Sequence, residues 1–269
     1  MHLHLNLSAD ANPQKLFEGV KFRLTIFFAT NNGKGLYSTK YTRWFAEERK
    51  VLFTSLVKYN SIDNYNYQNI IPKIPGRLYI SALNKMRSQQ AFFFMGNGNH
   101  ICRYHNAPVN WIRSHSFVPY FCSERDGEGI TTQLKPISFY DQADVEIASS
   151  ILNSSLFFIW WICNSDCYHL NKPEISNFKY TKKSDDDNDI RLIAKELATD
   201  MQQKSVRRVY NYKTSGRVEY DEFYMKLSKP IIDKIDKVLA RHYGFTEEEL
   251  DFIINYDIKY RMSDELNEE

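Results

Sequence analysis

The spacing of apolar residues along the chain predicts three long helices. These helices span residues 142–162, 190–204 and 230–243. In each, apolar side chains recur every three or four positions, which places them on one face. Asp141 can cap the first helix, and Gly244 stands where the third must end. The inward face of the second consists of Leu192, Ile193, Leu197 and Met201. Thr246 and Glu249 form a capping-box pattern that begins a fourth helix.

Short apolar runs broken by Gly, Asn and Pro fill residues 77–140 and predict a mainly β region. The candidate strands are residues 91–95, 100–105, 111–113 and 135–140. Residues 24–30 are β-branched and aromatic and predict a buried strand, and residues 41–50 predict the start of a helix. A domain boundary is expected at residues 60–76, which are rich in Asn and Tyr and then in Pro.

Charge and aromatic content are compatible with nucleic-acid binding without requiring it. The formal net charge is +2 and the isoelectric point is about 8.2, well short of the strongly basic character of a dedicated nucleic-acid domain. The chain has 18 tyrosines and 18 phenylalanines. Aromatic rings fill cores and also stack on bases, so composition leaves both roles open.

The sequence favours a cytoplasmic protein without a membrane partner or a metal site. The longest apolar run, residues 156–163, is far shorter than the roughly 20 residues that span a bilayer. No signal peptide opens the chain, so we expect reduced thiols. Cys163 and Cys167 have a spacing close to that of zinc ligands, but a second tight Cys or His pair is missing. We expect both to be small buried side chains.

Several segments resemble the carboxy-terminal half of the large adenine-specific DNA methyltransferases of type II, type IIG-like, restriction–modification systems. The segments are residues 13–28, 104–113, 134–139, 148–161 and 229–261. In that family the first segment closes the methyltransferase sheet. The middle segments belong to the target-recognition domain, and the last segment follows that domain.

The resemblance implies an α+β fold in three parts. Residues 1–60 would be the terminal part of the methyltransferase domain, a remnant of its doubly wound α/β sheet. Residues 77–228 would form a mixed, mainly β target-recognition domain with packing helices, and residues 229–269 a carboxy-terminal helical segment. Double-stranded DNA would then be the partner.

The catalytic motifs of that family are missing from the sequence. We find no Gly-rich turn after a first strand, where backbone approaches S-adenosylmethionine. We also find no (Asn/Asp)-Pro-Pro-(Tyr/Phe) tetrad, which holds the flipped base, and no Pro-Pro pair occurs. We therefore expect no cofactor and no catalytic residue in this chain. The family's cofactor, S-adenosylmethionine, would be bound by a separate catalytic methyltransferase chain.

Basic residues in the middle of the chain are the candidate DNA contacts. They are Arg103, His105, Arg113, Arg125, Lys135, Arg207 and Arg208. Guanidinium groups form paired hydrogen bonds with phosphates or guanine edges, and several candidates interleave with aromatic residues. We interpret residues 210–216, after the last two, as a connector.

A second interpretation stays open. Any one of these basic residues can be an ordinary solvated side chain. The chain would then be a non-functional gene remnant or a protein-interaction module that does not bind DNA.

Overall fold

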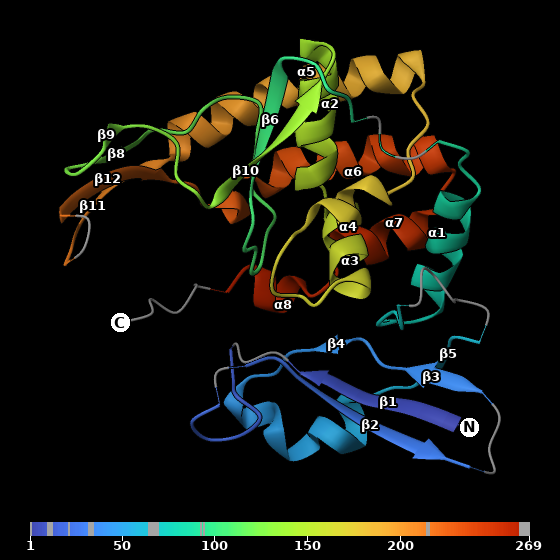
Figure 1. Cartoon of the computed structure of the whole chain (residues 1–269). Helices are drawn as coiled ribbons and strands as arrows, with labels where there is room; N and C mark the ends of the chain where they lie inside the picture. Colours follow the sequence, from blue (N-terminus) through green and yellow to red (C-terminus); the bar gives the residue numbers. More distant parts are fainter. Residues whose placement is uncertain are drawn as a thin grey trace.

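A computed structural model describes residues 2–9, 13–20, 22–31, 35–63, 70–91, 93, 95–213 and 216–263. The fold is mixed α+β, as expected, and its described strands form three small sheets around a group of helices. The amino-terminal strands, blue in Figure 1, lie as a layer below the helices.

Five short strands form the amino-terminal sheet. They are β1 (His2–Ala9), β2 (Leu24–Thr30), β3 (Leu36–Ser38), β4 (Tyr41–Thr42) and β5 (Asn60–Ser61). β1 pairs antiparallel with β2 and parallel with β3 and β4. The predicted strand at residues 24–30 is confirmed, but its predicted burial is wrong. β2 lies at the sheet edge, where Phe27 is 64% and Phe28 54% exposed.

The helix predicted to start within residues 41–50 begins later than expected. Tyr41 and Thr42 instead pair with β1, which holds them extended. A 3₁₀ helix, η1 (Ala46–Val51), and a π-helical turn, η2 (Leu52–Leu56), follow.

Two antiparallel sheets organise the middle of the chain. The three-stranded sheet has the order β10 (Leu134–Phe139), β6 (His100–His105) and β7 (Ser114–His115). The four-stranded sheet has the order β11 (Val206–Tyr212), β12 (Gly216–Glu222), β8 (Phe121–Ser123) and β9 (Gly127–Glu128). The strands predicted at residues 100–105 and 135–140 are confirmed to within one residue.

Other predictions for the mainly β region are wrong. Residues 91, 93, 95 and 111–113 lie outside strands. The region instead opens with a helix, α1 (Arg77–Arg87), which packs against a helix of the carboxy-terminal segment. The buried apolar residues of this segment therefore lie on one face of a helix and not in a strand.

The helix predicted at residues 142–162 is two helices. α2 (Gln142–Asn153) and α3 (Ser155–Asn164) meet at Ser154 with a bend of 66°. Asp141 caps α2 as predicted, since its carboxylate accepts the N–H of Asp144 at 2.7 Å. Ser154 begins α3 because its backbone is extended and its hydroxyl oxygen accepts the N–H of Phe157 at 3.0 Å. Among the described residues, no single helix is long and apolar enough to cross a membrane, although this bent pair passes that test together.

The remaining helices are α4 (Lys172–Ser176), α5 (Ser184–Lys204), η3 (Met225–Ser228), α6 (Lys229–Tyr243), α7 (Glu247–Ile254) and α8 (Ile258–Arg261). Of these, α6 and α7 match the prediction closely and α5 begins six residues before the predicted helix, whereas α4, η3 and α8 were not predicted. Gly244 ends α6 at φ 69°, and the Thr246–Glu249 capping box opens α7. The predicted inward face of α5 is wrong at Leu192, which is 69% exposed.

Helices rather than strands form most of the interior. Every residue of α3 is buried, and α2, α6 and α7 contribute to the same apolar cluster, which extends from Tyr41 to Tyr256. Arg261 is buried against this cluster with its guanidinium 3.8 Å from the centre of the Trp111 ring. A separate small cluster of Leu16, Trp44 and Leu52 packs with the amino-terminal strands.

Candidate nucleic-acid interface

A cavity of about 490 Å³ lies between the three-stranded and the four-stranded sheet. Five of its aromatic lining residues are Tyr120, Phe121, Tyr212, Tyr220 and Phe223. Its polar lining includes His105, Arg113, His115, Gln133, Asp221 and Glu222. Residues more than 100 positions apart in the chain therefore meet here. Two of the lining residues, His105 and Arg113, are candidate DNA contacts from the sequence.

His105 lies at the end of β6 and is half-buried. Its Nε2 atom hydrogen-bonds Oε1 of Gln133 at 2.8 Å. Burial, followed by the nearby Arg113 charge, lowers the pKa of His105 to about 4. The imidazole is therefore neutral at pH 7 and contributes hydrogen bonds rather than a positive charge.

His115 is a second neutral imidazole in the same wall. It is 3% exposed and lies between Phe117 and Phe223, with ring centroids 5.2 and 4.8 Å away. Burial lowers the pKa of His115 to about 3, with a smaller effect from Arg113. Its Nδ1 atom has no hydrogen-bond partner among the described residues.

Arg113 holds the first positive charge at the cavity. It precedes β7, and its carbonyl oxygen accepts the N–H of His105 at 2.8 Å, which fixes its backbone beside β6. Burial raises the pKa of Glu222, but hydrogen bonds from Tyr224 and Arg208 outweigh this and lower it overall. The charge of Arg113 adds to the lowering. Arg113 thus lies close enough to act electrostatically on several lining groups.

The β11–β12 hairpin brings two more arginines to the cavity. Arg207 Nε donates to Asp221 at 2.6 Å, and its guanidinium lies 3.7 Å from the centre of the Tyr120 ring. Arg208 Nε donates to Glu222 at 2.8 Å. Both acceptor carboxylates line the cavity, so each arginine is anchored at its edge.

Exposed tyrosines cover the same hairpin. Tyr210 and Tyr212 are about half exposed. Tyr210 stacks on Tyr220 with ring centroids 6.0 Å apart and planes at 16°. The predicted connector at residues 210–216 is therefore wrong where the structure describes it, because residues 210–212 belong to β11 and Gly216 begins β12.

Arg207 and Arg208 lie at the edge of the cavity, and the three other candidates outside the lining have no side-chain partner in it among the described residues. Lys135 faces the opposite side of β10 from the lining residue Leu134, because successive strand residues alternate between faces. Arg125 lies between β8 and β9, is exposed, and pairs with Asp126 at 3.0 Å. Arg103 is opposite His115 in the strand register, on the same face of β6 as His105, and is half-buried.

Sequence reasoning missed the tyrosines and the acids of the hairpin. The alternation of Val206, Arg208, Tyr210 and Tyr212 on one face of β11 is a strand pattern that could have identified them. The match between the hairpin and β8 is a long-range pairing, and no local signal encodes it.

Other chemistry is limited. Within the described ranges, no group of His, Cys, Asp or Glu side chains is arranged to hold a metal ion. Cys163 and Cys167 are buried as expected, and Cys167 Sγ donates to the Ile162 carbonyl at 3.2 Å. A second, more open cavity of about 770 Å³ beside α7 is lined by Glu247, Glu248 and Asp251. Its acidic lining would repel phosphates.

Comparison with known proteins adds no relative. No protein-family model matches the chain, and neither the curated proteins nor the solved structures contain a significant match. The resemblance to adenine-specific methyltransferases therefore stays a prediction from the residues quoted above.

Proposed function

We propose that this chain binds double-stranded DNA at the cavity between the two middle sheets, as the target-recognition portion of an adenine-specific DNA methyltransferase. The observation that carries the proposal is that Arg113 lines one aromatic cavity together with Asp221 and Glu222. These two carboxylates hold Arg207 and Arg208, which lie nearly 100 residues from Arg113 in sequence. Arginine is the residue best suited to phosphates and guanine edges, and tyrosine rings stack on bases.

The ion pairs of the hairpin are compatible with this role. Arg207 and Asp221 form an exposed pair, with 48% and 20% of their side chains accessible. Such pairs contribute little to stability, about 0–1 kcal/mol. A DNA phosphate can therefore replace or share the carboxylate partner at low cost.

In this proposal, catalysis belongs to a separate methyltransferase chain that binds S-adenosylmethionine in the cytoplasm. The amino-terminal strands would then be the end of that enzyme's doubly wound sheet. Their exposed Phe27 and Phe28 support the idea, because an edge strand with exposed rings can extend a larger sheet.

A filter-binding series across salt concentrations tests DNA binding. We expect retention of duplex DNA at low salt and a steep loss as salt rises, because phosphate contacts release counterions. Arg113→Ala should weaken binding, with the salt slope reduced by about one unit if Arg113 contacts a phosphate. Lys237→Ala is the matched control, since Lys237 is exposed on α6 outside the cavity lining.

Circular dichroism must show that each variant is folded. If the folded wild-type chain retains no DNA at low salt, the proposal is wrong and the interaction-module interpretation gains support. If Arg113→Ala and Lys237→Ala weaken binding equally, the DNA site lies elsewhere.

A further inference from the structure

The size and lining of the two-sheet cavity suit a small planar molecule. Its volume of about 490 Å³ lies within the roughly 300–1,000 Å³ typical of small-molecule sites. Phe121, Tyr212 and Tyr220 line it from the four-stranded sheet, and His105 and Arg113 from the side of β6 and β7. A flat ligand would thus have aromatic faces on one side and polar groups on the other.

This wall of the cavity contains a buried polar atom without a hydrogen-bond partner among the described residues. His115 lines the cavity, is 3% exposed, and has no partner for Nδ1 among the described residues. Burial of an unsatisfied polar atom costs about 1–3 kcal/mol. A ligand that drew the His115 ring slightly toward the cavity would offset part of that cost with its own hydrogen-bonding groups.

The tyrosines provide a stacking surface that a base can extend. Tyr220 already stacks on Tyr210, and the half-exposed Tyr212 lies 6.2 Å from Tyr210, measured between ring centroids. Stacking of a base on an aromatic side chain is worth about 1–3 kcal/mol. The hairpin therefore offers affinity for a ring rather than for a phosphate alone.

The opposite side offers groups that recognise a base edge. The Gln133 amide has both donors and an acceptor, and the Arg113 guanidinium has donors in a plane. His105 is hydrogen-bonded to Gln133 and fixes its position. This imidazole adds no charge to the wall, so Arg113 is the cation that a base edge would meet there.

We propose that this cavity holds one unstacked nucleobase, with its faces against the hairpin tyrosines and its edge toward Gln133 and Arg113. The inference deepens the proposed function and rests on it for DNA as the source of the base. A free mononucleotide presents the same chemistry, so the experiment separates the two sources.

Fluorescence anisotropy with three labelled duplexes of one sequence tests the proposal. The first duplex is fully paired, the second has one unpaired adenine, and the third has an abasic site at that position. We expect roughly tenfold tighter binding of the unpaired-adenine duplex than of the abasic duplex, from the stacking of one base. The abasic duplex controls for flexibility of the DNA backbone.

Variants at the cavity identify the site. Tyr212→Leu and Tyr220→Leu should each remove the preference for the unpaired base and leave salt-dependent binding of the paired duplex. Tyr140→Leu is the matched control, because Tyr140 is 71% exposed and lies outside the cavity lining. Circular dichroism and urea unfolding confirm that the compared variants are folded.

The outcomes separate the inference from the proposed function. Calorimetric binding of adenosine monophosphate that Tyr220→Leu abolishes supports the cavity with a free nucleotide as source. Equal affinity for the unpaired-adenine and abasic duplexes, without mononucleotide binding, overturns the inference but leaves duplex recognition standing. Absence of binding to every duplex overturns the proposed function. The mononucleotide titration then shows whether the cavity binds a base in the absence of DNA binding.

Discussion

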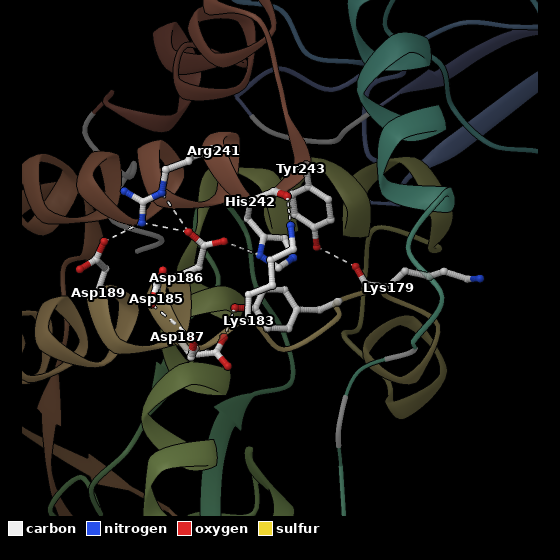
Figure 2. A network of polar contacts seen from close by, with 11 residues as sticks. Lys179, Lys183, Asp185, Asp186, Asp187, Asp189, Arg241, His242 and Tyr243 are labelled. Atoms are coloured by element: carbon white, nitrogen blue, oxygen red, sulfur yellow. Dashed lines mark hydrogen bonds and ion pairs between the residues drawn. The ribbon is translucent and has the colours of Figure 1, made fainter.

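The carboxylate of Asp186 lies 3.0 Å from Nδ1 of His242 and ties the first turn of α5 to the last turn of α6. Figure 2 shows this contact together with Arg241, which donates from Nε to the other oxygen of Asp186 at 2.9 Å and reaches Asp189 at 2.6 Å. The His242 ring also stacks on Tyr180, with centroids 4.4 Å apart. One carboxylate therefore pairs at once with Nδ1 of a buried imidazole and with an arginine.

Asp186→Ala is expected to lower the free energy of unfolding by about 1–3 kcal/mol. The change leaves the buried Nδ1 of His242 without its partner, and an unsatisfied buried group costs that much. Asp189→Ala is the control, because Asp189 is half exposed and its exposed pair with Arg241 contributes about 0–1 kcal/mol. Urea unfolding followed by circular dichroism measures both, and equal losses would contradict the expectation.

Asp236→Ala is expected to destabilise the fold more strongly, by about 3–5 kcal/mol. The buried Asp236 carboxylate accepts the N–H groups of Ser155 and Leu156, each at 3.2 Å, at the start of α3. Its loss leaves two buried N–H donors without acceptors and removes the carboxylate that acts most strongly on the buried Arg261 cation. Asp233→Ala, one turn earlier on α6, removes only a partly exposed pair with Lys229 and should cost much less.

The stability of the protein should fall as pH drops below about 6.5, in part through His115. Its pKa is lowered to about 3 in the folded chain by burial, from an ordinary value of 6.5. The unfolded chain therefore takes up a proton first, and the unfolding free energy falls by about 1.4 kcal/mol per pH unit for this one group. The effect is absent above pH 6.5 and complete near pH 3.

Asp236 works in the opposite direction. Burial raises its pKa from 3.8 to about 6, so the stability due to its protonated form is full below pH 3.8 and lost as pH rises through 6. The contribution of His115 is therefore isolated by measuring the unfolding free energy of wild type and of His115→Phe in urea at several pH values from 7 to 4, and comparing how it changes with pH. The variant should show the shallower decline, and parallel curves would rule out the role of His115.

Gly244→Ala is expected to cost about 1–2 kcal/mol. Gly244 ends α6 at φ 69°, a conformation that a Cβ disfavours even though no atom lies within 4 Å of it. Gly129→Ala is the control, because Gly129 has equally open space without a positive φ. Thermal unfolding should separate the two, and a smaller loss for Gly244→Asn would confirm a backbone cause.

Asp221→Asn should strengthen DNA binding if the proposed interface is right. The change removes the negative charge that pairs with Arg207 and leaves the hairpin register in place. A filter-binding assay at low salt should then show higher affinity than wild type. Asp251→Asn on α7, in the acidic cavity, should leave affinity unchanged. Lower affinity for Asp221→Asn would argue that Asp221 positions Arg207 for binding.

Local patterns predicted the elements whose ends carry their own signals. α6 and α7 have Gly244 and a capping box at their boundaries, and both ends of α6 and the start of α7 were placed within about one residue. The spacing of Tyr79, Ala82, Leu83 and Met86 is also helical, so α1 could have been predicted from the sequence. The nearby prolines and the strands downstream favour a different interpretation of that segment.

The break between α2 and α3 could not be inferred from periodicity. Apolar residues continue across Ser154, and the second helix is buried on all sides, so its pattern has no polar face to show a change of direction. The bend depends on Asp236, about 80 residues later, which caps the start of α3. The candidate interface has the same property, because the long-range pairing of β12 with β8 places Asp221, the partner of Arg207, in the cavity that Arg113 also lines.

This dependence of α3 on distant residues has a consequence for synthesis on the ribosome. The central helix receives its capping carboxylate from α6, and Trp111 Nε1 donates to the carbonyl of Arg261 at 3.0 Å. Neither contact can form until residues 236–261 have left the exit tunnel. The most apolar segment of the chain must therefore wait, exposed, while residues 165–261 are synthesised, and a nascent chain stalled before Asp236 should be a chaperone substrate.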